Sequence, residues 1–431
     1  MGIDRERLQD LLGTCREWCR EHVRAEDLGE LEGLVADVVR AVGEAMMQEC
    51  LPSLASEHGR PDGGVRCSCG HKARYVSDRP RGVGTQYGVV EVSRAYYHCR
   101  HCRSSYVPWD ASQGLSSLQW TPRVKGLVAQ AVGYMTYSEA VEMLALFTGL
   151  RIEESCAERI VAEVSGRLRA EETTLIEACA GGTVASLGSP APERLYIAMD
   201  GVSAHIDGSY HEVKVGLTYD GVPGEDGIDR CVGQRYVAAQ ERAEAFGERL
   251  YAAAVQAGLH AAVHTVVIGD GADWIWNLAD LHYPEAAQIL DYWHACEHIH
   301  SLARTHYGEG SAQGRRWADD HCRELKRSGP TSLLRALKRM NPRTPEDAEA
   351  IQRELGYFTR NRHRMQYGSF RVQGLMIGSG PAEAGCKSVV TTRFKRTGMR
   401  WSAGGADAVI AIRTAMLSGD SHRVQNAAKA A

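Results

Sequence analysis

The chain has 431 residues, of which 44% are hydrophobic and 24% charged, and its formal net charge is −4. This length and composition predict two or three globular units and exclude a fibrous or disordered protein. The start, Met1-Gly2-Ile3, has no apolar signal core, and no apolar stretch is long enough to span a bilayer. We therefore expect a cytoplasmic protein without a membrane partner, whose 13 cysteines are reduced.

The N-terminal region, residues 1–60, is predicted to be helical. Apolar residues such as Leu31, Leu34, Val35 and Val38 recur at helical spacing. Such a segment can pack on the rest of the chain, contact DNA or form a dimer, and the sequence leaves these alternatives open.

Residues 61–112 have a different character, because a loop at 61–64 leads into two short cysteine pairs around a strand-like run at 89–97. The four cysteines are Cys67, Cys69, Cys99 and Cys102. Four thiolates suit a tetrahedral structural zinc ion in a zinc-ribbon-like β module. The first pair is one residue shorter than usual, so His71, His98 and His101 are substitute ligands, and a reduced, metal-free cluster is the alternative.

Residues 113–180 are predicted to form a helical region with three helices. Thr136 with Glu139, and Ser155 with Glu158, match the capping box that opens a helix. Two capped helices across a short turn are the pattern of a DNA-binding helix-turn-helix, and a plain helical packing unit has the same pattern. A linker at 180–192 follows.

Residues 193–418 alternate between strand and helix patterns. Strands are predicted at 195–199, 212–217, 235–238, 265–268 and 287–290, with helices at 241–257 and from Trp274. This order indicates a mixed α/β sheet, interrupted by a mostly helical insertion at about 292–370 and closed by a helix after Pro381. The whole chain is therefore predicted to be a multidomain α+β protein.

Three acids are candidate catalytic residues. Asp200 and Asp270 each end an apolar strand, and strand ends of an α/β sheet meet at one edge. Glu383 lies in the first turn of the helix after Pro381. The alternatives to a catalytic role are that this acid interacts favourably with the helix dipole or pairs with Lys387 on the surface. Three carboxylates suit two Mg²⁺ or Mn²⁺ ions, which activate water and stabilise the leaving oxygen in phosphodiester cleavage.

Positive charge is concentrated in the same part of the chain. Residues 355–401 contain nine Lys or Arg residues, and Glu383 is their only acid. In an acidic chain, such a segment is typical of phosphate binding, whereas a solvated helix face normally mixes the signs of its charges.

The motifs resemble those of a known family. Segments 269–277 (GDGADWIWN), 378–387 (GSGPAEAGCK) and 393–402 (RFKRTGMRWS) resemble the second-aspartate motif, the glutamate motif and the following signature of ISKra-type insertion-sequence transposases. Residues 199–201 match the first-aspartate position. The resemblance spans nearly the whole chain and includes the N-terminal helices and the cysteine pairs.

This resemblance implies an RNase H-like α/β catalytic domain with a DDE triad, Asp200, Asp270 and Glu383, and a helical insertion before the glutamate. It also implies recognition of the transposon's terminal repeats and a homo-oligomer that handles two ends together. Asp291 and His294 are similar to the aspartate/cysteine-x-x-histidine motif of the distantly related Mutator-like transposases, so His294 is a candidate DNA-positioning residue or an ordinary helix-start histidine. The further predicted DNA-binding residues are Lys387, Arg393, Lys395, Arg396, Arg400 and Trp401.

The predicted function is that of a bacterial, nucleoid-associated DDE transposase. It would cleave double-stranded DNA at transposon ends and transfer the freed 3′-hydroxyl into target DNA, using two Mg²⁺ or Mn²⁺ ions, with structural Zn²⁺ in the cysteine module. One rival is an RNase H-like nuclease or resolvase that does not join strands. The other is a catalytically inactive, zinc-containing DNA-binding regulator; a structural or redox protein is more distant.

Overall fold

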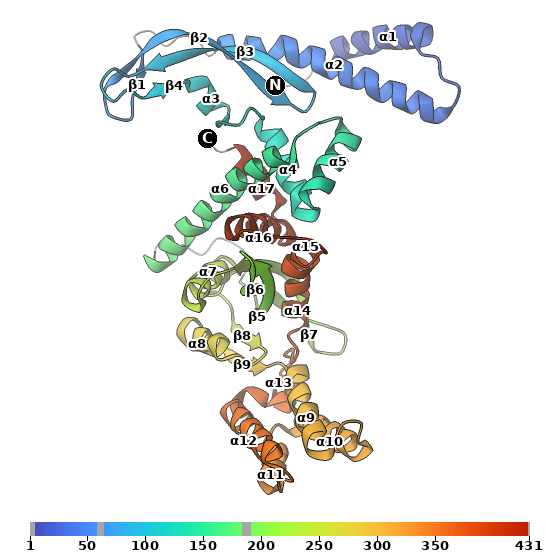
Figure 1. The fold of residues 1–431 in the computed structure, drawn as a ribbon, viewed down its shortest axis with the longest axis vertical. Helices are drawn as coiled ribbons and strands as arrows, with labels where there is room; N and C mark the ends of the chain where they lie inside the picture. Colours follow the sequence, from blue (N-terminus) through green and yellow to red (C-terminus); the bar gives the residue numbers. More distant parts are fainter. Residues whose placement is uncertain (1–4, 58–63, 183–190, 430–431) are drawn as a thin grey trace. The chain divides into compact units, whose positions relative to one another are not determined.

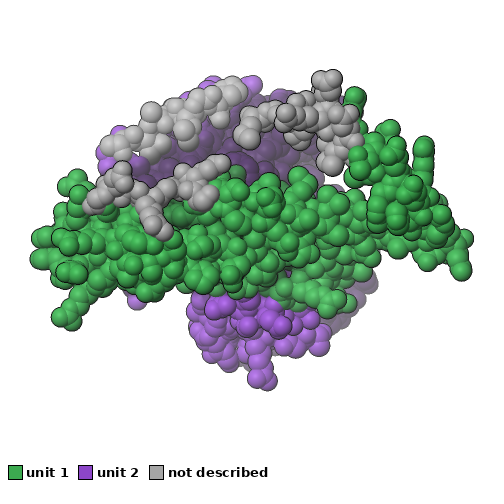
Figure 2. Space-filling view, turned by 90° about the horizontal axis from the view of Figure 1, so that it is seen from above, with its two compact units in different colours: residues 1–125, 141–152, 429–431 green, residues 126–140, 153–428 purple. Residues whose placement is uncertain are grey.

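A computed structural model describes residues 5–57, 64–182 and 191–429, so most of the loop at 61–64 and of the linker at 180–192 lies outside the described residues. The chain forms two compact units, coloured separately in Figure 2. Unit 1 comprises residues 1–125, 141–152 and 429–431, and unit 2 comprises residues 126–140 and 153–428. The fold is mixed α+β with two sheets, as the sequence predicts at this level.

Unit 1 begins with two helices, α1 (Arg5–His22) and α2 (Leu28–Glu57), which confirm the helical prediction for this region. Met47, Leu51 and Ala55 of α2 pack on a small core that contains Val83 and Val90. Although α2 has 30 residues, none of the helices in the described ranges is long and apolar enough to cross a membrane.

The first sheet is antiparallel and lies in unit 1. Its order is β1 (Val65–Arg66), β2 (Lys72–Thr85), β3 (Gly88–His98) and β4 (Ser105–Tyr106), followed by the short helix α3 (Pro108–Ser112). The predicted β structure between the two cysteine pairs is thereby confirmed. The cysteines lie at the strand ends, where turns can bring their thiols together.

Three helices follow, α4 (Pro122–Tyr134), α5 (Tyr137–Thr148) and α6 (Glu154–Ala180), as predicted. Thr136 and Glu139 form both bonds of a capping box, at 2.9 and 3.1 Å. The second predicted box is wrong: α6 already begins at Glu154, after Glu153 in extended conformation without a side-chain cap. Ser155 therefore lies inside the helix, where its backbone is helical and cannot serve as the cap.

The second sheet forms the centre of unit 2 (Figure 1). Its strands are β5 (Arg194–Ile206), β6 (Ser209–Pro223), β7 (Asp229–Ala239), β8 (His264–Gly269) and β9 (Ala287–Leu290), in the order β7-β6-β5-β8-β9. The pairs β5–β6 and β6–β7 are antiparallel, whereas β5–β8 and β8–β9 are parallel. All five predicted strands are present, and the first three are longer than predicted. The prediction that Asp200 ends the first strand is wrong, because β5 continues to Ile206 through its antiparallel pairing with β6.

Helices cover both faces of this sheet. α7 (Ala243–Gln256) and α8 (Asp273–His282) follow the predicted helices, and Gly216 of β6 faces Phe246 and Leu250 of α7. The neighbouring residue Val215 points to the opposite face, where Gly385 packs against it. That face receives the C-terminal elements α14 (Gly380–Gly385), η2 (Cys386–Thr391) and α16 (Ala403–Leu417). The short α15 (Thr392–Phe394) follows η2, and α17 (Ser421–Lys429) contacts α4 and α6.

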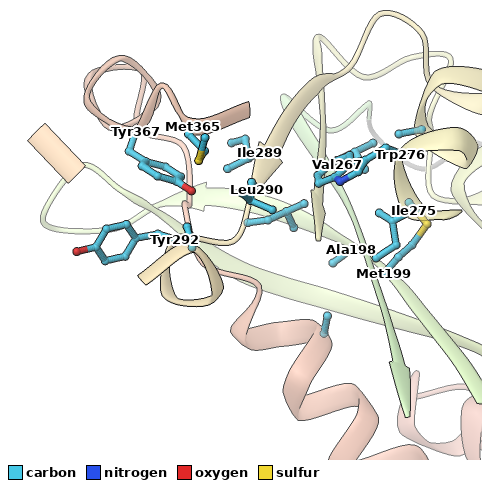
Figure 3. Packing of buried hydrophobic residues seen from close by; sticks show 14 of the residues in the cluster. Ala198, Met199, Val267, Ile275, Trp276, Ile289, Leu290, Tyr292, Met365 and Tyr367 are labelled. Atoms are coloured by element: carbon cyan, nitrogen blue, oxygen red, sulfur yellow. The ribbon is translucent and has the colours of Figure 1, made fainter. Parts of the chain in front are cut away.

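The predicted helical insertion is present after β9. It contains α9 (Tyr292–Tyr307), α10 (Ala312–Ser328), α11 (Thr331–Arg339), α12 (Pro345–Arg360), η1 (Arg362–Met365) and α13 (Tyr367–Val372). Figure 3 shows Tyr292, Met365 and Tyr367 beside Ile289 and Leu290 of β9. The insertion therefore shares one hydrophobic core with the sheet that holds Asp200.

Candidate functional site

Asp200 projects from the central strand of the second sheet. Residues 195–199 of β5 are fully buried, and Asp200, which follows them, is only partly buried. Asp200 pairs with Val215 of β6, so the two side chains share a face of the sheet. Because Val215 contacts Gly385, Asp200 faces the helix that carries Glu383.

Asp270 lies beside Asp200. Met199 pairs with Gly269 in the parallel β5–β8 ladder, and the two aspartates are the next residues of their strands. The Oδ1 atom of Asp270 accepts a 3.0 Å bond from the Ala272 N–H, and its backbone carbonyl accepts a 3.3 Å bond from Tyr357. The following Gly271 has φ +102°, and a Cβ there would lie 2.6 Å from the Tyr357 hydroxyl, which explains the glycine.

Glu383 lies in α14, which begins after Ser379 and has Pro381 near its start, as predicted. The helical segment continues to Phe394. The Glu383 carboxylate accepts a 3.0 Å bond from the ammonium of Lys387, and both side chains are 68% exposed. The surface pair that the sequence left open as an alternative is therefore present, and the Glu383 carboxylate is turned toward Lys387.

The acids nevertheless interact electrostatically. Burial raises the pKa of Asp200, and the negative charges of Asp270 and Glu383 raise it further, while hydrogen bonds from Cys386 and Gly201 partly offset these effects. Among the described residues, neither Asp200 nor Asp270 forms a salt bridge with a basic side chain. Two neighbouring carboxylates with no basic partner form an environment that fits a cation.

The three acids do not, however, form a closed ligand set. Across residues 5–57, 64–182 and 191–429, two overlapping groups have ligand atoms within 4.8 Å of one another, and both belong to the cysteine module. Glu383 would have to exchange Lys387 for the aspartates before all three could hold the same pair of ions.

The segment after Glu383 contains a π-helical turn, η2, which leaves backbone carbonyls without their usual helical partners. Arg413 of α16, 6% exposed, donates to the carbonyls of Ser388 and Val389, the latter at 2.8 Å, and to the Thr392 hydroxyl at 3.1 Å. It also donates to the carbonyl of Gly133. Burial lowers the pKa of Arg413 to about 10, so it remains charged at neutral pH. Arg413 thus holds the turn that follows Glu383.

Two of the predicted DNA-binding residues are buried. Arg393 is 1% exposed and Trp401 is 8% exposed, and the guanidinium lies 4.7 Å from the centre of the indole ring. Arg393 also lies near the ring of Tyr137 and bonds the Val132 carbonyl at 3.4 Å. Packing against neighbouring rings therefore removes Arg393 and Trp401 from the surface in this conformation.

The remaining predicted cations are exposed, and two of them have acidic partners. Lys387 pairs with Glu383, and Arg396 forms two 2.6 Å bonds with Glu139. Lys395 and Arg400 are exposed, and no salt bridge is found for either in the described part of the chain. The basic segment is therefore only partly a free phosphate-binding surface.

His294 lies in the first turn of α9, close to the strand that precedes Asp270. Asp291 caps this helix by accepting a 2.7 Å bond from the His294 N–H, and its own N–H donates to the Gly269 carbonyl at 2.8 Å. The His294 ring lies 3.5 Å from the carboxylate of Glu297 and faces a cavity of about 1060 Å³ in the insertion. Its position fits either of the roles that the sequence left open.

The cysteine module contains the most compact ligand group. The thiol of Cys67 lies 3.3 Å from Cys69 and 3.3 Å from Cys102, and Cys69 lies 3.7 Å from Cys99. Zinc–sulfur bonds of about 2.3 Å in a tetrahedron place sulfurs about 3.8 Å apart. The four thiols are therefore close to the spacing that a zinc ion requires, so this cluster could hold such an ion.

Hydrogen bonds lower the pKa of Cys67 and Cys102, whereas the pKa of Cys69 is raised. The Tyr106 hydroxyl lies 3.0 Å from the Cys67 sulfur, and this bond is the main cause that lowers the pKa of Cys67 to about 5. His71 and His101 also lie near Cys69, but their rings are stacked with centres 3.7 Å apart. Parallel stacked rings cannot both point a ring nitrogen at one ion, so the four cysteines are the better ligand set.

Several residues of the site were not predicted. Cys386 donates to Asp200, Tyr357 bonds the Asp270 carbonyl, and Asp291 accepts bonds from both the N–H and the hydroxyl of Ser379, the latter at 2.8 Å. Asp291 is noted above only for its motif with His294, but it offered a further signal, because it directly follows an apolar strand as Asp270 does. Cys386, Tyr357 and Arg413 offered none, since their partners are far away in the sequence.

No protein-family model matches this chain, and no curated protein matches it.

Proposed function

We propose that this protein is a DDE transposase that cleaves and joins DNA at the ends of a mobile element. The observation that carries the proposal is the position of Asp200 in β5 beside Asp270, which directly follows the neighbouring parallel strand β8, on the side where Glu383 approaches. Acids gathered in this way, without a basic partner for either aspartate, suit divalent metal ions and phosphodiester chemistry.

The topology of the second sheet supports the proposal. Three antiparallel strands followed by two parallel ones, in the order β7-β6-β5-β8-β9, are the arrangement expected for an RNase H-like domain. The first acid lies on the central strand, the second ends its parallel neighbour, and the glutamate lies on a later helix. This order agrees with the family resemblance of the motifs.

Divalent Mg²⁺ or Mn²⁺ ions held by Asp200, Asp270 and Glu383 would activate water and stabilise the leaving oxygen. The chain itself positions the acids. Cys386 orients the Asp200 carboxylate, and Tyr357 fixes the backbone at Asp270. Movement of Glu383 from Lys387 toward the aspartates would complete the ligand set.

The DNA partner is supported by a smaller set of residues than the sequence suggested. Lys395 and Arg400 are exposed and close in sequence to the site, while Lys387 and Arg396 could contact phosphates by exchanging Glu383 and Glu139. We propose that this surface and His294 contact DNA near the cleavage point. Zinc bound by Cys67, Cys69, Cys99 and Cys102 would stabilise the module proposed to take part in terminal-repeat recognition.

Cleavage of labelled DNA that carries the element's own ends tests the proposal. Wild type and the variant Glu383→Gln are compared with Mg²⁺ or Mn²⁺, and DNA binding is measured separately in Ca²⁺. The proposal expects binding by both proteins and cleavage by wild type alone. Equal cleavage by the two would show that Glu383 is not the third ligand.

A DNA-binding regulator without catalysis is the second candidate, and the Glu383–Lys387 pair favours it because it leaves the ligand set incomplete. This candidate expects tight DNA binding without cleavage in any divalent metal. A nuclease that does not join strands is distinguished by strand transfer: precut ends with a free 3′-hydroxyl become joined to target DNA only if the protein is a transposase.

A further inference from the structure

A cavity of about 640 Å³ lies within unit 2, beside the loop that joins α15 to α16. This volume is in the range of pockets that bind small molecules. The lining residues come from the start of α5, from the first half of α6 and from the segment between residues 393 and 408. We call it the Arg393 cavity, because Arg393 is the buried charge among its lining residues.

Arg393 is buried without a charged partner. It is 1% exposed, and its Nη2 atom has no hydrogen-bond partner among the described residues. The other two nitrogens contact neutral acceptors, the Val132 carbonyl and the Met399 sulfur, each at 3.4 Å. Burial lowers the pKa of Arg393 to about 10, so the side chain is charged at neutral pH. A buried cation of this kind is costly unless an anion compensates it.

The neighbouring acids do not compensate this charge. Glu154 and Glu158 line the cavity but are exposed to water, and neither forms a salt bridge with Arg393 in the described part of the chain. Glu139, whose charge also acts on Arg393, is bound by Arg396 through two 2.6 Å bonds. The buried guanidinium is therefore available to an anion that enters the cavity.

Helix starts add further donors around the cavity. Three helices begin at it: α5 with Tyr137, α6 with Glu154 and α16 after its cap Ser402. The first N–H groups of a helix have no helical partner, and their partial positive charge favours phosphate groups. Trp401 also lines the cavity, and its indole N–H is buried without a partner among the described residues. The cavity is therefore rich in hydrogen-bond donors.

We propose that the Arg393 cavity binds a phosphate monoester, with the phosphate group held by Arg393. The planar guanidinium matches two phosphate oxygens, and its Nη2 atom can donate to one of them. Arg159 and Arg400 are exposed lining residues and add positive charge for the approaching anion. The rings of Tyr137 and Trp401 lie 5.9 and 4.7 Å from the guanidinium and offer apolar faces to the group that carries the phosphate.

Two sources present such a phosphate: a free nucleotide and the 5′-phosphate at the end of a DNA strand. Both are terminal groups that can enter a cavity of this size. The internal phosphates of a duplex lie along a continuous backbone, which cannot enter it. Asp200, Asp270 and Glu383 do not line the cavity, and this inference does not depend on the proposed catalytic function.

Isothermal titration calorimetry of the full chain tests the proposal, with inorganic phosphate and adenosine 5′-monophosphate as probes. Mg²⁺ and Mn²⁺ are left out, so that neither probe binds through a divalent ion at the acids. We expect both probes to bind, the monophosphate with a dissociation constant of about 1 mM or lower, whereas adenosine does not. Equal binding of adenosine, or no binding of either phosphate probe at about 10 mM, overturns the proposal.

Two substitutions at Gly404 test the location of the site. Gly404 is exposed, lines the cavity, and a Cβ added there meets no atom within 4 Å. Gly404→Glu places a carboxylate in the first turn of α16, where an acid is compatible with the helix, and should weaken monophosphate binding at least tenfold. Gly404→Ala is the matched control and should bind as wild type does. Equal affinities of these two variants overturn the location.

Substitution of the guanidinium itself is the second test. Arg393→Met should abolish binding, whereas Arg396→Met, in the same basic loop but outside the cavity, should retain it. Binding by a folded Arg393→Met variant with wild-type affinity overturns the proposal. If this variant does not fold, the Gly404 pair decides the question.

Competition with short DNA duplexes distinguishes the two sources of the phosphate. If DNA ends are the source, a duplex with 5′-phosphates displaces the bound monophosphate and the same duplex with 5′-hydroxyls does not. If a free nucleotide is the source, neither duplex displaces it. Equal displacement by both duplexes contradicts a site for terminal phosphates. Because no step measures cleavage, these outcomes are separate from the fate of the proposed function.

Discussion

The cysteine module and the acidic site show two ways of building a place for a cation. The four thiols lie 3.3–3.7 Å apart in the measured pairs, within one small hairpin module. The acids come from β5, β8 and α14, and one of them, Glu383, is paired with Lys387. The thiols are assembled by local turns, whereas the acids depend on packing between distant segments.

Because of this difference, the two sites should respond differently to the loss of a metal ion. The four thiols and the neighbouring Tyr106 hydroxyl belong to one short segment of the chain. A small module of this kind depends on its bound metal for stability. The acids lie on a large hydrophobic core that does not need an ion to form. Loss of metal should therefore unfold the cysteine module but leave the second sheet intact.

The largest expected effect concerns catalysis. Asp270→Asn keeps the shape of the side chain and removes its charge, so cleavage should fall by roughly 10³-fold or more, because a metal ligand is lost. Cleavage of the element's labelled ends measures it. Asp220→Asn, in β6 of the same sheet, is the control and should cleave normally. Unchanged cleavage by the Asp270 variant would remove this residue from the site.

The next effect concerns the cysteine module. Cys99 is fully buried, and Cys99→Ala should abolish zinc binding and lower the stability of this module by at least about 3 kcal/mol. Elemental analysis and thermal unfolding measure the two effects. Cys50→Ser, at an exposed position of α2, should retain one zinc ion per chain. Equal metal content in both variants would assign the metal to other ligands.

Replacement of the buried Arg413 should also lower the stability of the fold, in this case within unit 2. Arg413→Met leaves the carbonyls of Ser388 and Val389 without their donor, so the free energy of unfolding should fall by roughly 3 kcal/mol. Chemical denaturation measures the change. Arg423→Met removes only an exposed pair with Glu171 at 3.3 Å and should cost less than about 1 kcal/mol. Similar losses for the two would mean that the π-helical turn does not need Arg413.

A smaller effect should depend on pH. Burial raises the pKa of Asp200 above its ordinary value of 3.8, so the folded state binds the proton more tightly than the unfolded state. Asp200 therefore reduces the stability of the fold as pH rises from 3.8 through the raised pKa. Asp200→Asn should remove this loss, so its stability advantage over wild type grows with pH across that window. Metal-free denaturation curves at several pH values test this, and an advantage that shrinks as pH rises contradicts it.

The smallest effect concerns the exposed pair at Glu383. Lys387→Met frees the carboxylate, so the Mn²⁺ concentration for half-maximal cleavage should fall roughly twofold to fivefold, while stability changes by less than about 0.5 kcal/mol. A metal titration of cleavage measures the first quantity. Arg371→Met, elsewhere in the basic segment, is the control. An increased metal requirement would show that Lys387 assists the site instead of competing for Glu383.

Strand and helix positions were predictable because they depend on local patterns. The apolar run before Asp200 is long enough to identify a strand, and the Thr136–Glu139 capping box formed as its spacing required. Ser155 shows the limit of such patterns, because the same spacing occurs inside α6, where the backbone began its helix earlier. A cap depends on where the chain turns, which distant packing decides.

The basic segment shows a second limit. Nine cations in residues 355–401 suggested one phosphate-binding surface, but the sequence does not reveal that Arg393 is buried against Trp401 or that Arg396 pairs with Glu139. Charge is visible in the sequence, whereas burial and pairing depend on which side chains the fold brings near. The same reason kept Arg413 and Tyr357 out of the predicted site.

The order of strands and helices, the position of Asp270 directly after an apolar strand and the grouping of four cysteines around a β hairpin could be predicted from the sequence alone. These features depend on residue type and on spacing over a few turns of chain. Three further features follow from the fold: Asp200 and Asp270 lie side by side, Glu383 is turned to Lys387, and one side of α2 remains exposed. These depend on contacts between residues tens to hundreds of positions apart, whose geometry the hydrophobic core determines.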